Sequence, residues 1–169
     1  GFYMDEKSLN ACDENGILIW HDYPFACALY PADSAYLEGV RIDAELNTFR
    51  IASHPCVALF CGNNEVFEGW ENWGWKKEVR DTVVALKNYE RLFKDILPEI
   101  VSITAEMSDY VHTSPIHGWG KPQSMTEGDS HYWGVWWGDS VFETYTRKVP
   151  RFMSEFGFQS PANLETVSG

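Results

Sequence analysis

The chain has 169 residues, which fits one domain or part of a larger one. Its 13 Lys and Arg residues against 25 Asp and Glu residues give a net charge of −12, so we expect neither nucleic acid nor an anionic membrane as a partner. Apolar residues, at 44%, supply a core and exclude a disordered chain. No apolar run approaches the roughly 20 residues that span a bilayer, and residues 1–10 lack a signal-peptide pattern.

Aromatic residues make up 15% of the chain and include eight tryptophans. Tryptophan is seldom fully buried, and its flat ring suits the face of a sugar, although an aromatic-rich core is the alternative. The four cysteines form no C-x-x-C pair and have no histidine at metal-binding spacing. We therefore expect reduced, packed thiols, with a disulfide as the alternative, and the compartment of the protein is left open.

Helices and strands alternate in the first part of the chain. The pattern predicts a helix over 7–15, a strand over 17–20, a helix over 33–52 with Asp33 as its N-cap, and a buried strand over 57–61. A tryptophan-rich loop over 67–75 follows, and then helical material over 78–103 that we expect to break near Asn88 and Pro98.

The alternation continues in the second part. We expect a strand over 110–113, a long loop over 114–128, a strand over 130–133, a short helix over 140–148 and a last strand over 152–156. About five strand-then-helix units favour a parallel sheet with helical crossovers. Because no glycine-rich phosphate turn follows the first strand, a nucleotide-binding fold is not favoured. The sequence therefore predicts an α/β fold, namely a partial (β/α)8 TIM barrel, since a whole barrel takes about 250 residues.

Two glutamates stand where predicted strands end. Residues 57–61 lead into Glu65, and the last strand leads into Glu155, at the end of a barrel strand where functional groups gather. One such glutamate is commonly structural, but two in one parallel barrel favour chemistry. Glycoside hydrolysis needs two facing carboxyl groups, one as acid and one as nucleophile or base. Asn64 suits a hydrogen bond to a sugar hydroxyl.

These residues resemble glycoside hydrolase family 2, and within it the β-mannosidases. The resemblance rests on GNNE at 62–65 and SEFGFQS at 154–160, strengthened by GILIWHD at 16–22, FACALYP at 25–31 and GDSHYWGVW at 128–136. It extends from about residue 2 to residue 161, and the separated blocks stand in the family's order.

The resemblance implies a multidomain protein with a central barrel. Glu65 then corresponds to the acid/base at the end of strand four, preceded by Asn64, and Glu155 to the nucleophile at the end of strand seven. It implies retaining hydrolysis of terminal β-D-mannose from β-mannosides by double displacement, with the two carboxyl groups about 5–5.5 Å apart and without a metal or other cofactor.

The same resemblance makes residues 1–169 a fragment of a single catalytic barrel domain, about strands three to seven with their helices. The remaining barrel strands and the β-rich domains of the parent chain are then its partners, beside a β-mannoside oligosaccharide or glycan. Without them we expect the chain to be poorly active or inactive.

Further candidates for substrate binding lie in the predicted loops and strand ends. Trp20 and Asp22 end the first strand, where Trp20 serves either the sugar site or barrel packing. Trp73 resembles an aromatic wall of the sugar pocket, with Trp70 and Trp75 of the same loop as alternatives.

Trp119, in the long loop, is a candidate to close the pocket. Strand alternation points His131 and Trp133 to one side and Tyr132 to the other. His131 either orients Glu155 or is a structural histidine. A metal site at Asp129 and His131 is rejected because a third ligand is missing.

Three alternative functions remain open. Another family 2 specificity, such as β-galactosidase or β-glucuronidase, shares the same catalytic pattern. A noncatalytic carbohydrate-binding module would use the tryptophans alone, and a third possibility is a domain that assembles with other subunits through its aromatic surface.

Overall fold

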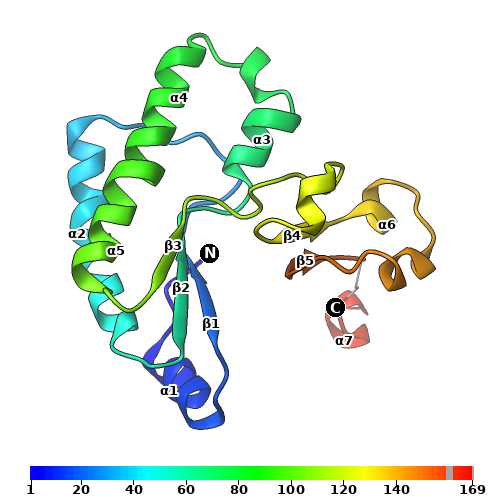
Figure 1. Ribbon diagram of the computed structural model, residues 1–169, viewed down its shortest axis with the longest axis horizontal. Coiled ribbons are helices and arrows are strands. Elements are labelled where there is room, and N and C mark those ends of the chain that lie inside the picture. The colour runs from blue at the N-terminus through cyan, green and yellow to red at the C-terminus, as the bar shows by residue number, and fades with distance from the viewer. Residues whose placement is uncertain (159–161, 169) are drawn as a thin grey trace. The chain divides into compact units, whose positions relative to one another are not determined.

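The computed structural model describes residues 1–158 and 162–168, which divide between two compact units, Gly1–Ser114 and Pro115–Gly169 (Figure 1). Gln159 and Ser160, the end of the SEFGFQS block, lie outside the described residues, as does Pro161. Among the residues described, no helix is both long enough and apolar enough to cross a membrane.

The first unit alternates helices and strands. In chain order its elements are α1 (Glu6–Asn15), β1 (Ile19–Asp22), α2 (Ser34–Ala52), β2 (Val57–Cys61), α3 (Val66–Asn72), a 3-10 turn (Trp75–Lys77), α4 (Thr82–Glu90), a π-helical turn (Arg91–Ile96), α5 (Leu97–Thr104) and β3 (Asp109–Val111).

The three strands form a parallel sheet in the order β1-β2-β3. The register pairs Asp22 with Cys61 and Cys61 with Val111, so the carboxyl ends of all three strands lie at one edge. Helices connect each strand to the next, and α2 packs along α5, where Arg41 and Glu99 form an ion pair at 2.8 Å. The predicted parallel pairing with helical crossovers is confirmed for this unit.

Local signals in the sequence account for the helix ends. Asp33 accepts a hydrogen bond from the backbone N–H of Tyr36 at 3.1 Å and caps α2, as predicted. Asp5 caps α1 in the same way through Ser8. Gly16 ends α1 with a left-handed backbone, φ 65°, a conformation that glycine adopts without steric cost.

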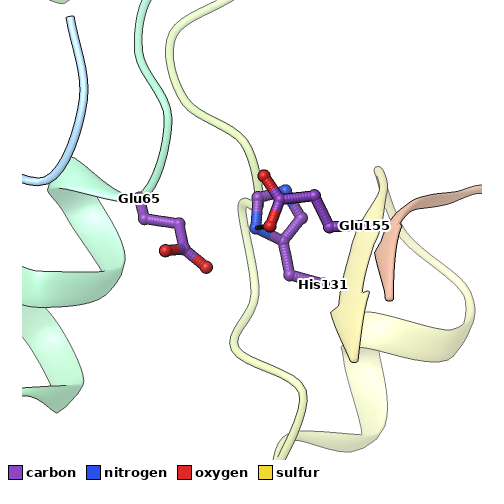
Figure 2. Close-up of side chains that lie close together, drawn as sticks. All are labelled: Glu65, His131 and Glu155. Atoms are coloured by element: carbon purple, nitrogen blue, oxygen red, sulfur yellow. Dashed lines mark ion pairs between the residues drawn. The ribbon is translucent and has the colours of Figure 1, made fainter. Parts of the chain in front are cut away.

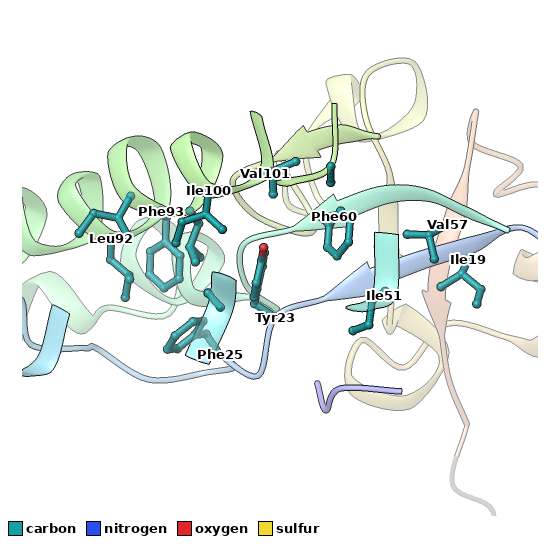
Figure 3. Close-up of a cluster of buried hydrophobic side chains, with 14 of the residues drawn as sticks. Ile19, Tyr23, Phe25, Ile51, Val57, Phe60, Leu92, Phe93, Ile100 and Val101 are labelled. Carbon is teal, nitrogen blue, oxygen red and sulfur yellow. The ribbon is translucent and has the colours of Figure 1, made fainter. Parts of the chain in front are cut away.

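The core of this unit lies between the sheet and the helices (Figure 3). Phe60 of β2, Ile51 of α2 and Ile100 of α5 are each at most 1% exposed. Burying a side chain of this size contributes about 1.5–3 kcal/mol relative to leaving it exposed. Within the core, the hydroxyls of Tyr23 and Thr48 lie 2.5 Å apart.

The second unit contains two parallel strands, β4 (Ser130–Tyr132) and β5 (Met153–Phe156). Its other elements are α6 (Gly134–Trp137), α7 (Leu164–Ser168) and 3-10 turns at Pro122–Met125 and Phe142–Thr146. Taken together, the described residues form a mixed α/β structure with parallel strands in two small sheets.

Two expectations for the first unit are wrong. The predicted loop over 67–75 is largely the helix α3, in which Trp70 is buried. The first strand begins at Ile19 rather than at residue 17, because the side chains of Ile17 and Leu18 are exposed. Apolar character alone therefore misplaced that strand by two residues.

Other boundaries also differ. The helical material does not break near Asn88 or Pro98 but runs from α4 to α5 through the π-helical turn. Since proline lacks the N–H that an interior helix position donates, the widened turn before Pro98 lets the helix continue. The predicted helix over 140–148 is only a 3-10 turn.

Candidate functional site

Glu65 follows β2 and immediately precedes α3, and Figure 2 shows it where a helix begins. Its backbone is left-handed, with φ 58° and ψ 11°, and its N–H donates to the carbonyl of Ser114 at 2.8 Å. The side chain is partly exposed, and its Oε2 lies 3.7 Å from the Sγ of Cys27. The carboxyl group thus stands on a fixed backbone at the carboxyl edge of the sheet.

Asn64 extends the sheet beyond its strands. Its N–H donates to the carbonyl of Phe25 and its carbonyl accepts from the N–H of Cys27, each at 2.9 Å. Isolated bridges join it to Ala26 on one side and Ser114 on the other. Its side-chain amide nitrogen lies 3.9 Å from the Sγ of Cys27, and Asn64 remains partly exposed.

Trp20 and Asp22 lie on β1 at the same edge. The indole N–H of Trp20 donates to Oδ1 of Asp22 at 2.9 Å. Because β1 and β2 are parallel with Asp22 opposite Cys61, these two side chains and the segment carrying Asn64 and Glu65 belong to neighbouring strand ends. The first unit therefore brings four of the predicted site residues to one edge.

The three tryptophans around α3 differ in exposure. Trp70 is 6% exposed and Trp75 is partly buried, whereas Trp73 is 46% exposed. Trp73 and Trp75 pack edge to face, with ring centroids 5.7 Å apart. The family resemblance selected Trp73 for the sugar wall, and it is the one of the three whose ring offers the most free surface.

In the second unit, Glu155 is held by two side chains of the neighbouring segment. The indole N–H of Trp133 donates to Oε2 of Glu155 at 3.2 Å. Nδ1 of His131 lies 3.5 Å from the same oxygen, the contact dashed in Figure 2. The parallel register sets His131 directly opposite Glu155. His131 and Trp133 thus share one side, as strand alternation predicts.

Asp129, which the sequence suggested only as a metal ligand, contacts Ser154 and His131. Its Oδ2 accepts from the hydroxyl of Ser154 at 2.5 Å and lies 3.5 Å from Nε2 of His131. Asp129 and His131 are at most 2% exposed. The imidazole therefore stands between two carboxyl groups, Asp129 on one side and Glu155 on the other. Asp129 directly precedes β4, and in an extended segment the D-x-H spacing places both side chains on one face, which is the signal that the sequence offers.

Trp119 contacts a different residue. Its ring packs edge to face on Tyr132, with centroids 5.7 Å apart, and 37% of it is exposed. Strand alternation directs Tyr132 to the opposite side from His131 and Trp133, and its hydroxyl lies 3.3 Å from that of Ser140. The structure accordingly groups Trp119 with Tyr132, and Trp133 and His131 with Glu155.

Two further residues near Glu65 were not singled out by sequence. Asn63 is completely buried beside the Glu65 segment, and Cys27 is exposed rather than packed, with a left-handed backbone at φ 43°. The expected packing of the cysteines holds for Cys56 and Cys61, which are buried. A polar side chain directly after a buried strand was the signal for Asn63.

Comparison with known proteins relates the chain to one kind of enzyme. No protein-family model matches it. The chain is 34% identical over 180 aligned residues to β-mannosidase B of Thermothelomyces thermophilus and 34% identical over 174 to that of Aspergillus terreus. In each case 99% of this chain is covered, and it spans about 20% of the relative's length.

A solved structure agrees with these relatives. The crystal structure of β-D-mannosidase from Dictyoglomus thermophilum matches with a TM-score of 0.81 and 36% identity, over 99% of this chain and 20% of that one. The resemblance to β-mannosidases expected from the sequence blocks is confirmed.

Proposed function

We propose that this chain, a homologue of the β-mannosidases over nearly its whole length, is the central part of the catalytic barrel of a retaining β-mannosidase. Residues 1–169 then form part of a single (β/α)8 domain, about strands three to seven with their helices. The similarity of the whole chain to proteins named β-mannosidase carries the proposal.

The positions of two glutamates support the choice of catalytic groups. Glu65 follows β2 and Glu155 lies in β5, and both strands belong to parallel sheets. Functional groups of (β/α)8 enzymes come from the carboxyl ends of such strands. Glu155 also receives a hydrogen bond from Trp133, which favours the carboxylate form that a nucleophile needs.

In the first step, the Glu155 carboxylate attacks the anomeric carbon of the terminal mannose. Glu65, as the carboxylic acid, gives its proton to the glycosidic oxygen, so that the bond to the leaving group breaks and an alcohol departs. A mannosyl ester on Glu155 remains. This mechanism requires the two carboxyl groups about 5–5.5 Å apart.

In the second step, Glu65, now a carboxylate, takes a proton from water. The water oxygen attacks the anomeric carbon from the face that the leaving group occupied, and the ester bond to Glu155 breaks. Mannose leaves with its β configuration retained, and both glutamates return to their starting protonation states.

The remaining candidates form the sugar pocket in this proposal. Asn64 donates to a hydroxyl near the anomeric carbon, and Trp20 with Asp22 shapes the pocket beside it. Trp73 supplies an aromatic wall, while Trp119 closes the pocket from its own loop. His131 and Trp133 bound the pocket near Glu155 and hold its carboxylate. No metal or cofactor takes part.

Trapping the covalent intermediate tests the mechanism in the full-length protein. A 2-deoxy-2-fluoro-β-mannoside with a good leaving group should form a stable ester, because fluorine destabilises the positively charged transition state of both steps. We expect intact-mass analysis to show one added fluoromannosyl group, on the peptide that contains Glu155. Glu155→Gln should carry no label, and a label on another residue would refute the assignment.

Substrate specificity is measured on a panel of aryl β-glycosides. We expect the mannoside to give the highest kcat/KM, above the galactoside and the glucuronide; the reverse order would favour another family 2 specificity. A full-length protein that binds mannosides but hydrolyses none would favour a noncatalytic sugar-binding module, whereas a Glu155→Gln variant that loses hydrolysis and keeps binding supports the enzyme. The 169-residue chain alone should be poorly active, because the proposed parent barrel and its β-rich domains complete the pocket.

A further inference from the structure

The segment that carries Glu65 is held from inside the first unit by one buried amide, that of Asn63. Oδ1 of Asn63 accepts from the N–H of Val66 at 3.0 Å and from the hydroxyl of Thr113 at 2.8 Å. Its Nδ2 donates to the carbonyl of His112 at 2.8 Å and lies 3.4 Å from the hydroxyl of Tyr89. Asn63 is 0% exposed, so both ends of its amide are satisfied without solvent.

Backbone hydrogen bonds reinforce the same segment, which we call the 62–66 loop. The N–H of Ser114 donates to the carbonyl of Asn63 at 2.9 Å, and the N–H of Glu65 donates back to the carbonyl of Ser114 at 2.8 Å. Asn64 is bonded on its other side to Phe25 and Cys27. The 62–66 loop therefore continues the three-stranded sheet past the ends of its strands.

Glu65 itself has a backbone conformation that a residue with a Cβ seldom adopts. Its φ of 58° and ψ of 11° are left-handed, which costs an ordinary residue about 1–2 kcal/mol. The bond from the Val66 N–H to the Asn63 amide closes the turn around this residue. Without that bond, a return to negative φ would turn the Cα–Cβ direction and point the carboxyl group elsewhere.

We infer that Asn63 is a positioning residue for the acid/base Glu65, an inference that rests on the proposed function. The two adjacent asparagines, Asn63 and Asn64, have different roles in this inference. Asn64 stays partly exposed at the edge, where we propose that it meets sugar, whereas Asn63 points into the core and fixes the turn. Thr113 supports the same arrangement, because its hydroxyl is the second donor to the amide oxygen of Asn63.

The chemistry of a glycosidic acid makes this role measurable. Proton transfer to the leaving oxygen needs the acid within hydrogen-bond distance, and a displacement of about 1 Å costs about 100-fold in rate. A leaving group that is stable as an anion needs no proton, so its departure does not depend on where Glu65 points. Because kcat/KM reports the first, bond-breaking step, the comparison of two leaving groups isolates acid catalysis.

The test compares Asn63→Ala and Thr113→Val in the full-length protein on an alkyl β-mannoside and on 2,4-dinitrophenyl β-mannoside. Thr48→Val is the matched control, since it removes an equally buried hydroxyl from the same core at its bond with Tyr23. We expect Asn63→Ala to lower kcat/KM about 100-fold on the alkyl mannoside but less than about threefold on the dinitrophenyl one. Thr113→Val should lower the alkyl value about tenfold, and Thr48→Val should change neither.

Glu65→Gln, measured in the same assays, separates the acid role of Glu65 from the positioning role of Asn63. If Glu65→Gln keeps full activity on the alkyl mannoside, the acid assignment itself is overturned. If Glu65→Gln shows the leaving-group dependence while Asn63→Ala and Thr113→Val reduce both substrates equally, or neither, only the positioning role is overturned. Thr113→Val keeps the test decisive even where Asn63→Ala fails to fold.

Discussion

The indole N–H of Trp133 donates to Oε2 of Glu155 over 3.2 Å. The residue at position 157 determines whether the Trp133 ring has room to make this hydrogen bond. Gly157 lies so close to the Trp133 ring that a Cβ at this position would overlap the ring carbons. A glycine at 157 thus leaves room for the aromatic side chain that holds the proposed nucleophile.

Removing the indole donor should weaken catalysis for every leaving group. Trp133→Phe leaves a ring but no N–H, and a hydrogen bond to a charged group contributes about 1.5–3 kcal/mol. In the full-length protein we expect kcat/KM to fall about tenfold or more on alkyl and dinitrophenyl mannosides alike, because both need the proposed nucleophile, Glu155. Trp136→Phe, a change in α6 outside this contact, is the control; an unchanged Trp133→Phe would contradict the role.

Adding a methyl group at residue 157 should have the same catalytic effect by a steric route. Gly157→Ala displaces the Trp133 ring and so lengthens its contact with Glu155. We expect a fall in kcat/KM as large as in Trp133→Phe, with some loss of thermal stability from overpacking, about 1–3 kcal/mol. Kinetics and thermal unfolding of the variant, alone and combined with Trp133→Phe, provide the measurement. A double variant that is worse by the full product of the two losses would show that Gly157 acts elsewhere.

Two histidines, His21 buried and His112 partly buried, predict a loss of stability in mild acid. Burial lowers the pKa of His21 to about 4, and burial with a smaller effect of the Lys94 charge does the same for His112. The unfolded imidazoles take up protons below a pH of about 6.5, whereas the folded ones stay neutral. Stability is therefore complete above that pH and falls toward about pH 4 by about 1.4 kcal/mol per pH unit for each histidine.

Urea unfolding of His21→Phe across this range checks the slope. We expect the pH dependence of the free energy of unfolding to be smaller in the variant by the contribution of one histidine, about 1.4 kcal/mol per pH unit. Phe60→Leu, whose ring neighbours that of His21, should lower stability equally at every pH. An unchanged slope in His21→Phe would show that this imidazole is protonated in the folded state.

For a third histidine, His54, the pKa is raised in the folded protein rather than lowered. His54 lies 2.7 Å from Asp13 and 3.1 Å from Glu6, and these hydrogen bonds, the one to Asp13 first, raise its pKa. Hydrogen bonds from Cys56 and then from His54 lower the pKa of Asp13. The stability from His54 is present below a pH of about 6.5 and disappears as pH rises through its raised pKa, and that from Asp13 disappears in acid.

Asp13→Asn keeps an acceptor for the N–H of Cys56 but removes the charge beside His54. We expect its melting temperature to lie further below that of the unchanged protein at about pH 6 than at about pH 9. Thermal unfolding at the two pH values gives the answer, and an equal difference at both would argue against an ion pair with protonated His54.

Sequence reasoning was most successful where the signal was local. Asp33 as the cap of α2 and the apolar strand at 57–61 are confirmed, because a helix cap and a short apolar run are each set by a few neighbouring residues. It was least successful where tertiary packing decides. The sequence predicts a strand at Ile17 and Leu18, but both side chains are exposed and lie before β1. It predicts a loop at Trp70, which is buried in α3.

The candidate site divides along the same line. Glu65 and Glu155 stand out because a carboxylate at the end of an apolar strand is unusual in any single sequence. The partners that hold them come from distant positions, as Thr113 does for Asn63, and no spacing rule joins residues 50 positions apart. Only the folded chain shows that the amide of Asn63 and the ring of Trp133 are supports for their neighbours.

At position 65, the residue that best stabilises the left-handed backbone is not the residue that the proposed catalysis needs. Glycine adopts this conformation without the steric cost that a Cβ brings, and asparagine tolerates it better than glutamate does. Variants selected for heat resistance alone would therefore drift toward Gly or Asn at this position, whereas variants selected for mannoside turnover would keep the carboxyl group. A deep mutational scan read out by both criteria would show residue 65 ranked in opposite order by the two.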